Sequence, residues 1–141
     1  MEKTREWRIG KKVDSLLRGM LEKAHTPALT LWSLEDTIKE ALGEVYEMGR
    51  KDATHVHIAE YIRRGNSRDG INAIVDKLRK EDDDKFQADL VKEMFGKLSG
   101  SGNGNQRLDE VLPEVKATLV ETYTKSFERT ADQAQKTAKE A

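Results

Sequence analysis

The side chains best suited to metal chemistry in this 141-residue chain are His55 and His57, with Glu60 just after them. Imidazole nitrogens and carboxylate oxygens are common zinc ligands. On a helix His57 and Glu60 share a face and His55 sits apart, so a third ligand would have to come from another segment. No such segment is visible, and the chain has no cysteine. We therefore expect no metal site and no cofactor, with the histidines exposed or partly buried.

Three carboxylates form a second candidate group. Glu44 and Glu47, with Glu40 one turn before them, contain the pattern E-x-x-E. This pattern resembles the magnesium-binding carboxylates of the MazG-type nucleotide pyrophosphohydrolases, which are also all-helical. The companion E-x-x-D on a following helix is missing. An exposed acidic face is the preferred interpretation, and a magnesium-dependent pyrophosphohydrolase is the weakest of the functions considered.

Basic residues gather near the N-terminus. Arg5, Arg8 and Lys12 recur at steps of three and four, so on a helix they lie beside one another. Close to them in the sequence are Lys11, Arg18 and Trp7. Such a ridge can neutralise backbone phosphates of a nucleic acid, and the indole can stack on a base. Acidic residues are interspersed, so a solvated helix face is the alternative.

A second basic group surrounds a loop. Arg63, Arg64 and Arg68 flank Gly65, Asn66 and Ser67. A glycine-containing turn before a helix offers exposed amides as well as guanidinium groups, which suits an anion. It is not a P-loop, because the lysine and the spacing are absent. The alternative is that these arginines complement the dipole at a helix C-terminus.

Apolar residues at helical spacing predict an all-α fold, a small bundle of about five helices. The first helix is expected over Arg5–His25. A second begins at Ser33, where Ser33 and Asp36 suggest a capping box, and ends or kinks at Gly49. The stretch Thr54–Ile62 fits either a strand or a short helix, and the helix is favoured because no second strand is available. Later helices are expected after Asn66 or Ser67, around Phe86–Leu98 after a turn at Glu81–Asp84, and from Leu108 onwards with Pro113 in its first turn.

The organisation predicted along the chain has four parts. Residues 1–98 form a helical bundle, and 99–105, SGSGNGN, form a flexible loop or linker. Residues 106–127 form an amphipathic helix that either packs on the bundle or reaches beyond it. Residues 128–141 contain no large apolar side chain and are expected to be a frayed polar tail. The connection before the second helix is unusually apolar and is a candidate protein interface through Leu29, Leu31 and Trp32.

Composition limits the possible environments and partners. Only 36% of residues are apolar and 36% are charged, so the core must be thin and much of every helix must face water or a partner. The net charge of -1 neither favours nor disfavours a polyanion, so local clustering must decide. The charged N-terminus has no apolar signal core, and no window approaches the roughly 20 apolar residues of a membrane span. We expect a cytoplasmic protein with no membrane partner.

Two segments carry a resemblance to a known family. The stretch RRGNSRDGINAIVDKL, Arg63 to Leu78, and the stretch FQADLVKEMFGKL, Phe86 to Leu98, resemble the helical small subunits of CRISPR effector complexes. The resemblance covers about a quarter of the chain and includes no diagnostic motif. It implies an α-helical, non-catalytic subunit that stacks in a larger complex and supports nucleic acid through basic side chains. No binding residue of the family can be transferred to this sequence.

The leading hypothesis is a non-enzymatic subunit that contacts a nucleic-acid backbone, RNA or DNA, without reading its sequence. Its candidate contacts are the two basic groups, Arg5, Arg8, Lys11, Lys12, Arg18, Arg63, Arg64 and Arg68. The alternative is a helical adaptor or viral structural protein that docks on protein partners, or on copies of itself, through the apolar connection and the last helix.

Overall fold

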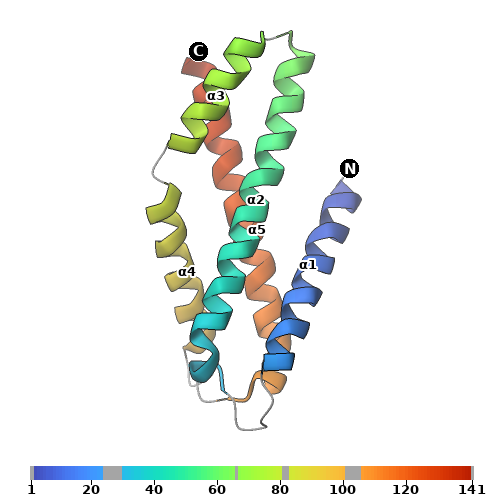
Figure 1. Cartoon of the computed structure of the whole chain (residues 1–141), viewed down its shortest axis with the longest axis vertical. Coiled ribbons are helices and arrows are strands. Elements are labelled where there is room, and N and C mark those ends of the chain that lie inside the picture. The colour runs from blue at the N-terminus through green and yellow to red at the C-terminus, as the bar shows by residue number, and fades with distance from the viewer. Residues whose placement is uncertain (1, 24–29, 66, 81–82, 101–105, 141) are drawn as a thin grey trace.

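The chain folds as an all-α bundle, as predicted from its sequence (Figure 1). The structure, a computed structural model, describes residues 2–23, 30–65, 67–80, 83–100 and 106–140. In chain order the elements are α1 (Glu2–Lys23), η1 (Trp32–Leu34), α2 (Glu35–Arg63), α3 (Arg68–Lys80), α4 (Asp83–Ser99), η3 (Leu108–Glu110) and α5 (Leu112–Glu140). These ranges contain no β-strand, and an isolated antiparallel bridge joins Thr30 to Arg107.

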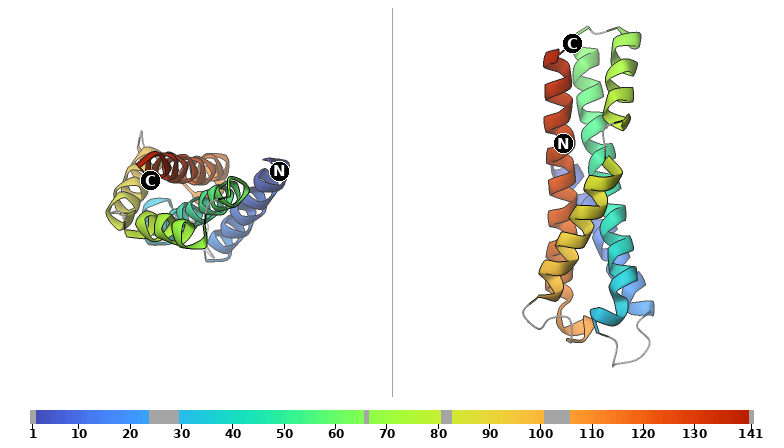
Figure 2. Two further views of the ribbon diagram at one scale, coloured as in Figure 1. Left: turned by 90° about the horizontal axis from the view of Figure 1, so that it is seen from above. Right: turned by 90° about the vertical axis from the view of Figure 1, so that its left-hand side faces the viewer.

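The two long helices α2 and α5 form the centre of the bundle. They lie side by side and run in the same direction, and α1 runs antiparallel to α2 on one side (Figures 1 and 2). On the other side α3 and α4 follow one another back down the bundle. The last helix therefore packs within the bundle instead of reaching beyond it, which decides between the two alternatives left open by the glycine-rich tract.

One continuous core joins α1, α2, α4 and α5. It is thin, as the composition predicts, and the two 3-10 turns η1 and η3 close its lower end. The buried apolar residues that form it are Ile9, Val13, Met20, Leu31, Leu34, Ile38, Ala41, Leu42, Val45, Tyr46, Leu90, Met94, Phe95, Leu98, Leu108, Val111, Val115, Leu119 and Tyr123. The core thus includes residues on both sides of the glycine-rich tract, of which 101–105 lie outside the described residues.

Gly49 does not end the second helix, so that prediction was wrong. α2 continues through Gly49 to Arg63, and the ambiguous stretch Thr54–Ile62 is helical as its last turns. Gly49 is buried where α2 and α5 cross. A Cβ atom there would lie 2.5 Å from the carbonyl oxygen of Tyr123 and 3.0 Å from Cβ of Ser126. The glycine is needed because the two backbones approach closely, and this reason is not visible in the local sequence.

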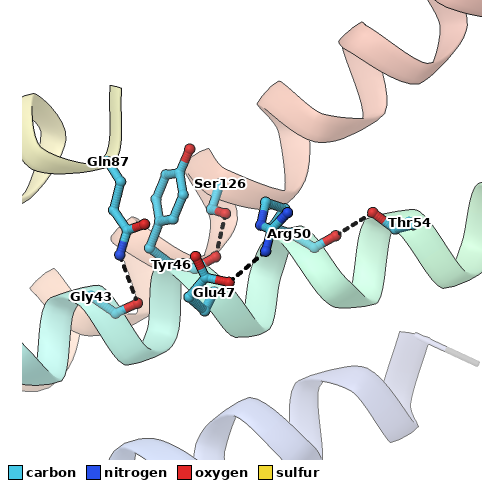
Figure 3. Close-up of polar contacts among 7 residues, drawn as sticks. All are labelled: Gly43, Tyr46, Glu47, Arg50, Thr54, Gln87 and Ser126. Carbon is cyan, nitrogen blue, oxygen red and sulfur yellow. Dashed lines mark hydrogen bonds and ion pairs between the residues drawn. The ribbon is translucent and has the colours of Figure 1, made fainter. Parts of the chain in front are cut away.

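α5 is helical to Glu140, across the stretch predicted to be a frayed tail, and Thr130 within that stretch is buried. The buried residues of α5 also include three small hydroxyl residues, Thr122, Ser126 and Thr130. The Ser126 hydroxyl donates to the Tyr46 carbonyl at 2.5 Å, which ties α5 to α2 (Figure 3). The Arg129 guanidinium lies 3.8 Å from the centre of the Phe86 ring on α4. Small polar side chains replace large apolar ones because the helices are too close for the latter.

The lower end of the bundle differs from the predicted capping box. Ser33 lies in η1, and α2 starts at Glu35 without a side-chain cap. Instead Thr30 and Ser33 cap each other. The Thr30 amide donates to Ser33 Oγ at 2.9 Å, and the Ser33 amide donates to Thr30 Oγ1 at 3.4 Å. The Leu31 amide then donates to the Gln106 carbonyl at 3.2 Å, so the connections before α2 and before α5 are joined.

The other helix ends are close to those predicted. Ser67 caps α3 by accepting a hydrogen bond from the Gly70 amide at 3.1 Å, and Pro113 lies in the first turn of α5. Asn66 and the start of the predicted turn at 81–84 lie outside the described residues, as do residues 24 and 25 at the predicted end of the first helix. None of the described helices is both long enough and apolar enough to span a membrane.

Candidate nucleic-acid interface

The basic ridge predicted on α1 faces α2, where carboxylates already bind it. Arg8 Nη1 lies 3.1 Å from Asp52 Oδ1, and Lys12 Nζ lies 3.5 Å from Glu44 Oε1. The side chain of Arg5 lies outside the described residues. Arg8 and Lys12 were predicted to bind phosphate. In this structure they pair with carboxylates of α2, so their charges are already partly compensated, and phosphate binding by these two residues stays a prediction.

Asp52 is the polar centre of the contact among three helices. Its side chain is only 7% exposed, and it accepts a hydrogen bond from the Tyr123 hydroxyl of α5 at 2.7 Å as well as the one from Arg8. A buried carboxylate is tolerated only when donors satisfy it, and here they come from α1 and α5. Sequence reasoning missed this role, because Asp52 follows Gly49 in a polar stretch that resembles a helix end.

Removing the Asp52 carboxylate is expected to loosen all three helices. We predict that Asp52→Ala lowers the free energy of unfolding by roughly 1–3 kcal/mol, since Arg8 and Tyr123 both lose an acceptor. Arg8 is half exposed, so its share is the smaller one. Urea unfolding of Asp52→Ala, Tyr123→Phe and the double variant measures the coupling. Additive effects would contradict the proposed link.

The opposite side of α1 carries basic residues that face solvent. We define the outer stripe as Trp7, Lys11, Asp14, Arg18 and Leu21, which recur at steps of three and four and are all exposed. Lys11 Nζ lies 4.1 Å from the centre of the Trp7 ring, a cation–π contact. Asp14 pairs with Lys116 of α5 at 3.6 Å. The outer stripe thus presents two cations and one carboxylate, which is paired with Lys116, beside an indole that is 60% exposed, and the exposed Glu22 lies one turn after Arg18.

The cations of the outer stripe differ from Arg8 and Lys12 in their ion pairing. Within the described part of the chain, neither Lys11 nor Arg18 forms an ion pair. Both were among the candidates, but sequence spacing gave equal weight to the side of α1 that binds α2. The spacing of Trp7, Lys11 and Arg18 could have placed these three residues on one helix face. The carboxylates of α2 that pair with Arg8 and Lys12 could not have been predicted from the sequence of α1.

The second basic group lies at the far end of the bundle, where α2 turns into α3. Gly65 adopts φ of +83°, the left-handed conformation that closes a helix C-terminus. Arg64 Nη2 lies 2.6 Å from Glu60 Oε1, so its charge is already compensated. Arg63 and Arg68 are exposed, one in the last turn of α2 and the other in the first turn of α3. The group therefore offers two solvent-facing guanidinium groups and one that is paired.

The residue near this turn whose pKa is shifted is Tyr61. It follows Glu60 in the sequence, and its side chain is buried. Burial raises the pKa of Tyr61 above its ordinary value, the Glu60 carboxylate raises it further, and the Arg64 guanidinium lowers it. The neutral phenol is thus the form that the folded protein favours. His55 is exposed, whereas His57 is buried, which was not expected, and packs against the Tyr61 ring with centroids 6.4 Å apart.

The apolar connection predicted to bind protein is only partly exposed. Leu31 is fully buried in the core, so its assignment to an exposed interface is wrong. Trp32 is 52% exposed, and its ring meets the edge of Phe95 at a centroid distance of 5.9 Å. Leu29 lies outside the described residues. The candidate protein interface therefore reduces to Trp32 within the described residues.

The acidic face of α2 borders a groove of about 590 Å³ in which carboxylates and cations alternate. Glu44 pairs with Lys12, and Glu47 Oε2 lies 2.8 Å from Arg50 Nη2 (Figure 3). In the described ranges, no group of three or more histidine, aspartate or glutamate side chains is placed to hold a metal ion. Residues of α1, α2 and α4 line this groove. They are Arg8, Lys12, Glu40, Gly43, Glu44, Glu47, Met48, Lys51, Asp52 and Gln87.

Comparison with known proteins identified no relative of this chain. No protein-family model matches the chain, and neither the curated proteins nor the solved structures contain a significant match.

Proposed function

We propose that this protein is a non-catalytic helical subunit that contacts a nucleic-acid backbone through the outer stripe of α1. The observation that carries the proposal is the grouping of Trp7, Lys11 and Arg18 on one exposed face. Lysine and arginine neutralise phosphates, and an exposed indole stacks on a base of any identity. Such contacts hold a strand without reading its sequence.

The second basic group is separate from the outer stripe and lies at the α2–α3 turn. Asp52, which Arg8 of α1 reaches, and Arg63 lie eleven residues apart on α2, which corresponds to about 16 Å along the helix. This span equals about five base-pair steps of a duplex. Arg63 and Arg68 could thus meet a second stretch of the same nucleic acid. Membership of a larger assembly, such as the CRISPR effector complexes whose small subunits the chain resembles, would supply the further contacts that a few cations cannot.

The test is a salt titration of the purified protein against fluorescent single-stranded and double-stranded oligonucleotides, DNA and RNA, of mixed sequence. We expect binding that weakens with salt. The double reversal Lys11→Glu with Arg18→Glu should weaken binding at low salt by roughly tenfold or more and reduce the salt slope by about 1.5–2, since two phosphate contacts are lost. Both side chains are exposed, so thermal unfolding should change little.

The matched control is the reversal of two exposed lysines on the far side of the bundle, Lys85→Glu with Lys92→Glu on α4. It changes the net charge by the same amount but leaves the outer stripe intact, so binding should weaken only slightly. Reversal of Arg8 is avoided because it would place two carboxylates together at Asp52. Equal losses in the two double variants, or no binding of the unmodified protein at low salt, would overturn the proposal.

A second candidate function is docking on protein, and the exposure of Trp32 favours it. A tryptophan that is half exposed yet fixed by an aromatic neighbour resembles the anchors of protein interfaces. The substitution Trp32→Ala distinguishes the two functions. Trp32→Ala should leave oligonucleotide binding unchanged under the nucleic-acid proposal, because Trp32 lies on η1 and not on the outer stripe.

A further inference from the structure

The outer stripe carries the most exposed aromatic ring among the described residues. Trp7 is 60% exposed, and Trp32 of η1, which follows it in exposure, is 52% exposed. Helix α1 lies at the edge of the bundle (Figure 2). A single exposed ring is ordinary on a protein surface. The Trp7 ring differs because one cation, Lys11, lies on it and a second, Arg18, follows on the same helix face.

Lys11 contacts only part of the Trp7 ring. Its Nζ atom lies 4.1 Å from the ring centre, so the ammonium group covers one face of the indole. A tryptophan that has this contact and is still 60% exposed leaves ring surface open to solvent. A base stacked on that surface would bring its own phosphate close to the Lys11 ammonium. Stacking and phosphate neutralisation are thus available from two neighbouring side chains.

The two kinds of contact favour different nucleic acids. A duplex presents one phosphate charge per roughly 1.7 Å of its axis and a single strand one per roughly 3.4 Å, so charge alone favours the duplex. The faces of paired bases are covered by the neighbouring base pairs. A ring on the surface of a helix can therefore stack only on an unpaired base. The preferred ligand depends on which contact contributes more.

The charge of the outer stripe is small. Lys11 and Arg18 are its cations, Asp14 is paired with Lys116, and the exposed Glu22 lies nearby. Raising the salt from about 50 to 200 mM weakens two phosphate contacts by about tenfold in total. Stacking on one base strengthens binding by roughly 5- to 150-fold. At moderate salt the indole therefore outweighs the two cations.

We propose that Trp7 is the specificity-determining residue of the outer stripe and selects single-stranded nucleic acid. Its indole stacks on an unpaired base, and Lys11 and Arg18 hold phosphates of the same strand. Trp7 and Arg18 are eleven residues apart, about 16 Å along α1, which equals about five nucleotide steps of a stacked strand. This inference rests on the proposed function, because it assigns the ligand class of the same surface.

The first test is competition against a fluorescent single strand bound to the full chain. The two unlabelled competitors have one sequence, as circular single-stranded DNA and as the covalently closed circular duplex, which has no terminal base. At equal nucleotide concentration the single strand should compete roughly fivefold better or more. Trp7→Ala should weaken single-strand binding roughly tenfold and remove this preference. It should leave the salt slope unchanged, since no phosphate contact is lost.

Trp32→Ala is the matched control, because it removes the other exposed tryptophan of the chain, on η1. It should keep the preference for the single strand. Trp7→Phe retains an aromatic ring and should keep part of the preference. The Trp7 ring lies outside the core, so thermal unfolding of Trp7→Ala should match that of the unmodified protein.

The second test reports on the ring itself and uses the presence of only two tryptophans in the chain. In Trp32→Phe the emission comes from Trp7, and the single strand should quench it more than the duplex does. In Trp7→Phe the emission comes from Trp32 and should not change.

The outcomes separate this inference from the proposed function. Equal competition by the two circles, or a preference that survives Trp7→Ala, would overturn the selection of single strands and leave backbone binding by Lys11 and Arg18 intact. Failure of the unmodified protein to bind either nucleic acid at low salt would overturn both proposals.

Discussion

Replacing Leu31 with alanine is expected to lower the free energy of unfolding by about 2–5 kcal/mol, the range for a fully buried leucine whose cavity cannot collapse. Leu31 is fully buried in the core, and its amide donates to the Gln106 carbonyl. The buried side chain therefore anchors the residue whose backbone joins the connection before α2 to the connection before α5. Chemical unfolding followed by circular dichroism measures the loss.

The neighbouring Trp32 supplies the control for Leu31. It is larger but 52% exposed, so Trp32→Ala should cost less, on the order of 1 kcal/mol for the edge contact with Phe95. Leu21→Ala, 41% exposed on α1, should cost less still. If Trp32→Ala destabilised the fold more than Leu31→Ala, the assignment of these two adjacent residues to surface and core would be reversed.

Adding one methyl group at Gly49 is expected to destabilise the bundle by about 1–3 kcal/mol. The new Cβ would lie 2.5 Å from the Tyr123 carbonyl oxygen, a backbone atom that cannot move unless α2 and α5 separate. Helix propensity works the other way, because alanine in a helix interior is favoured over glycine by about 1 kcal/mol. The steric cost is expected to exceed that gain, so Gly49→Ala should unfold at lower urea than the unmodified protein.

The same substitution at Gly96 should have the opposite sign. Gly96 lies within α4, and a Cβ there meets nothing within 4 Å. Gly96→Ala should therefore raise stability by roughly 0.5–1 kcal/mol through reduced backbone entropy of the unfolded chain. Because the chemical change is identical, the difference in sign isolates the contact between α2 and α5. Two variants of equal stability would mean that the helices are not in close contact at Gly49.

The fold class could be predicted because large apolar residues at helical spacing mark each buried face. The helix from Phe86 to Leu98 is such a case, and it appears within α4. The errors occur where burial uses other residues. Gly49 resembles a helix end and Ser126 a solvent-facing position, yet both are buried where α2 and α5 meet, and Thr130 of α5 is buried as well. Local periodicity of apolar residues cannot report a contact that depends on small side chains from a distant segment.

The candidate site was predictable to a similar extent and for a related reason. Spacing placed Arg8, Lys11, Lys12 and Arg18 on one helix, but it could not divide them between the side that binds α2 and the side that faces solvent. That division depends on Asp52 and Glu44, which are 44 and 32 positions further along the chain than Arg8 and Lys12. A charged residue on an isolated helix carries no information about its partner in a fold.

The parallel pairing of α2 and α5 has a consequence for the order in which the chain folds. The hydrogen bonds from Tyr123 to Asp52 and from Ser126 to Tyr46 span 71 and 80 residues. Helices that run in the same direction cannot be joined by a short turn, so α3 and α4 must return the chain before α5 can dock. During synthesis from the N-terminus, α2 is complete well before Ser126 is added. The surface of α2 that α5 covers is therefore exposed until late in translation, and refolding should be slower than in bundles whose neighbouring helices are consecutive.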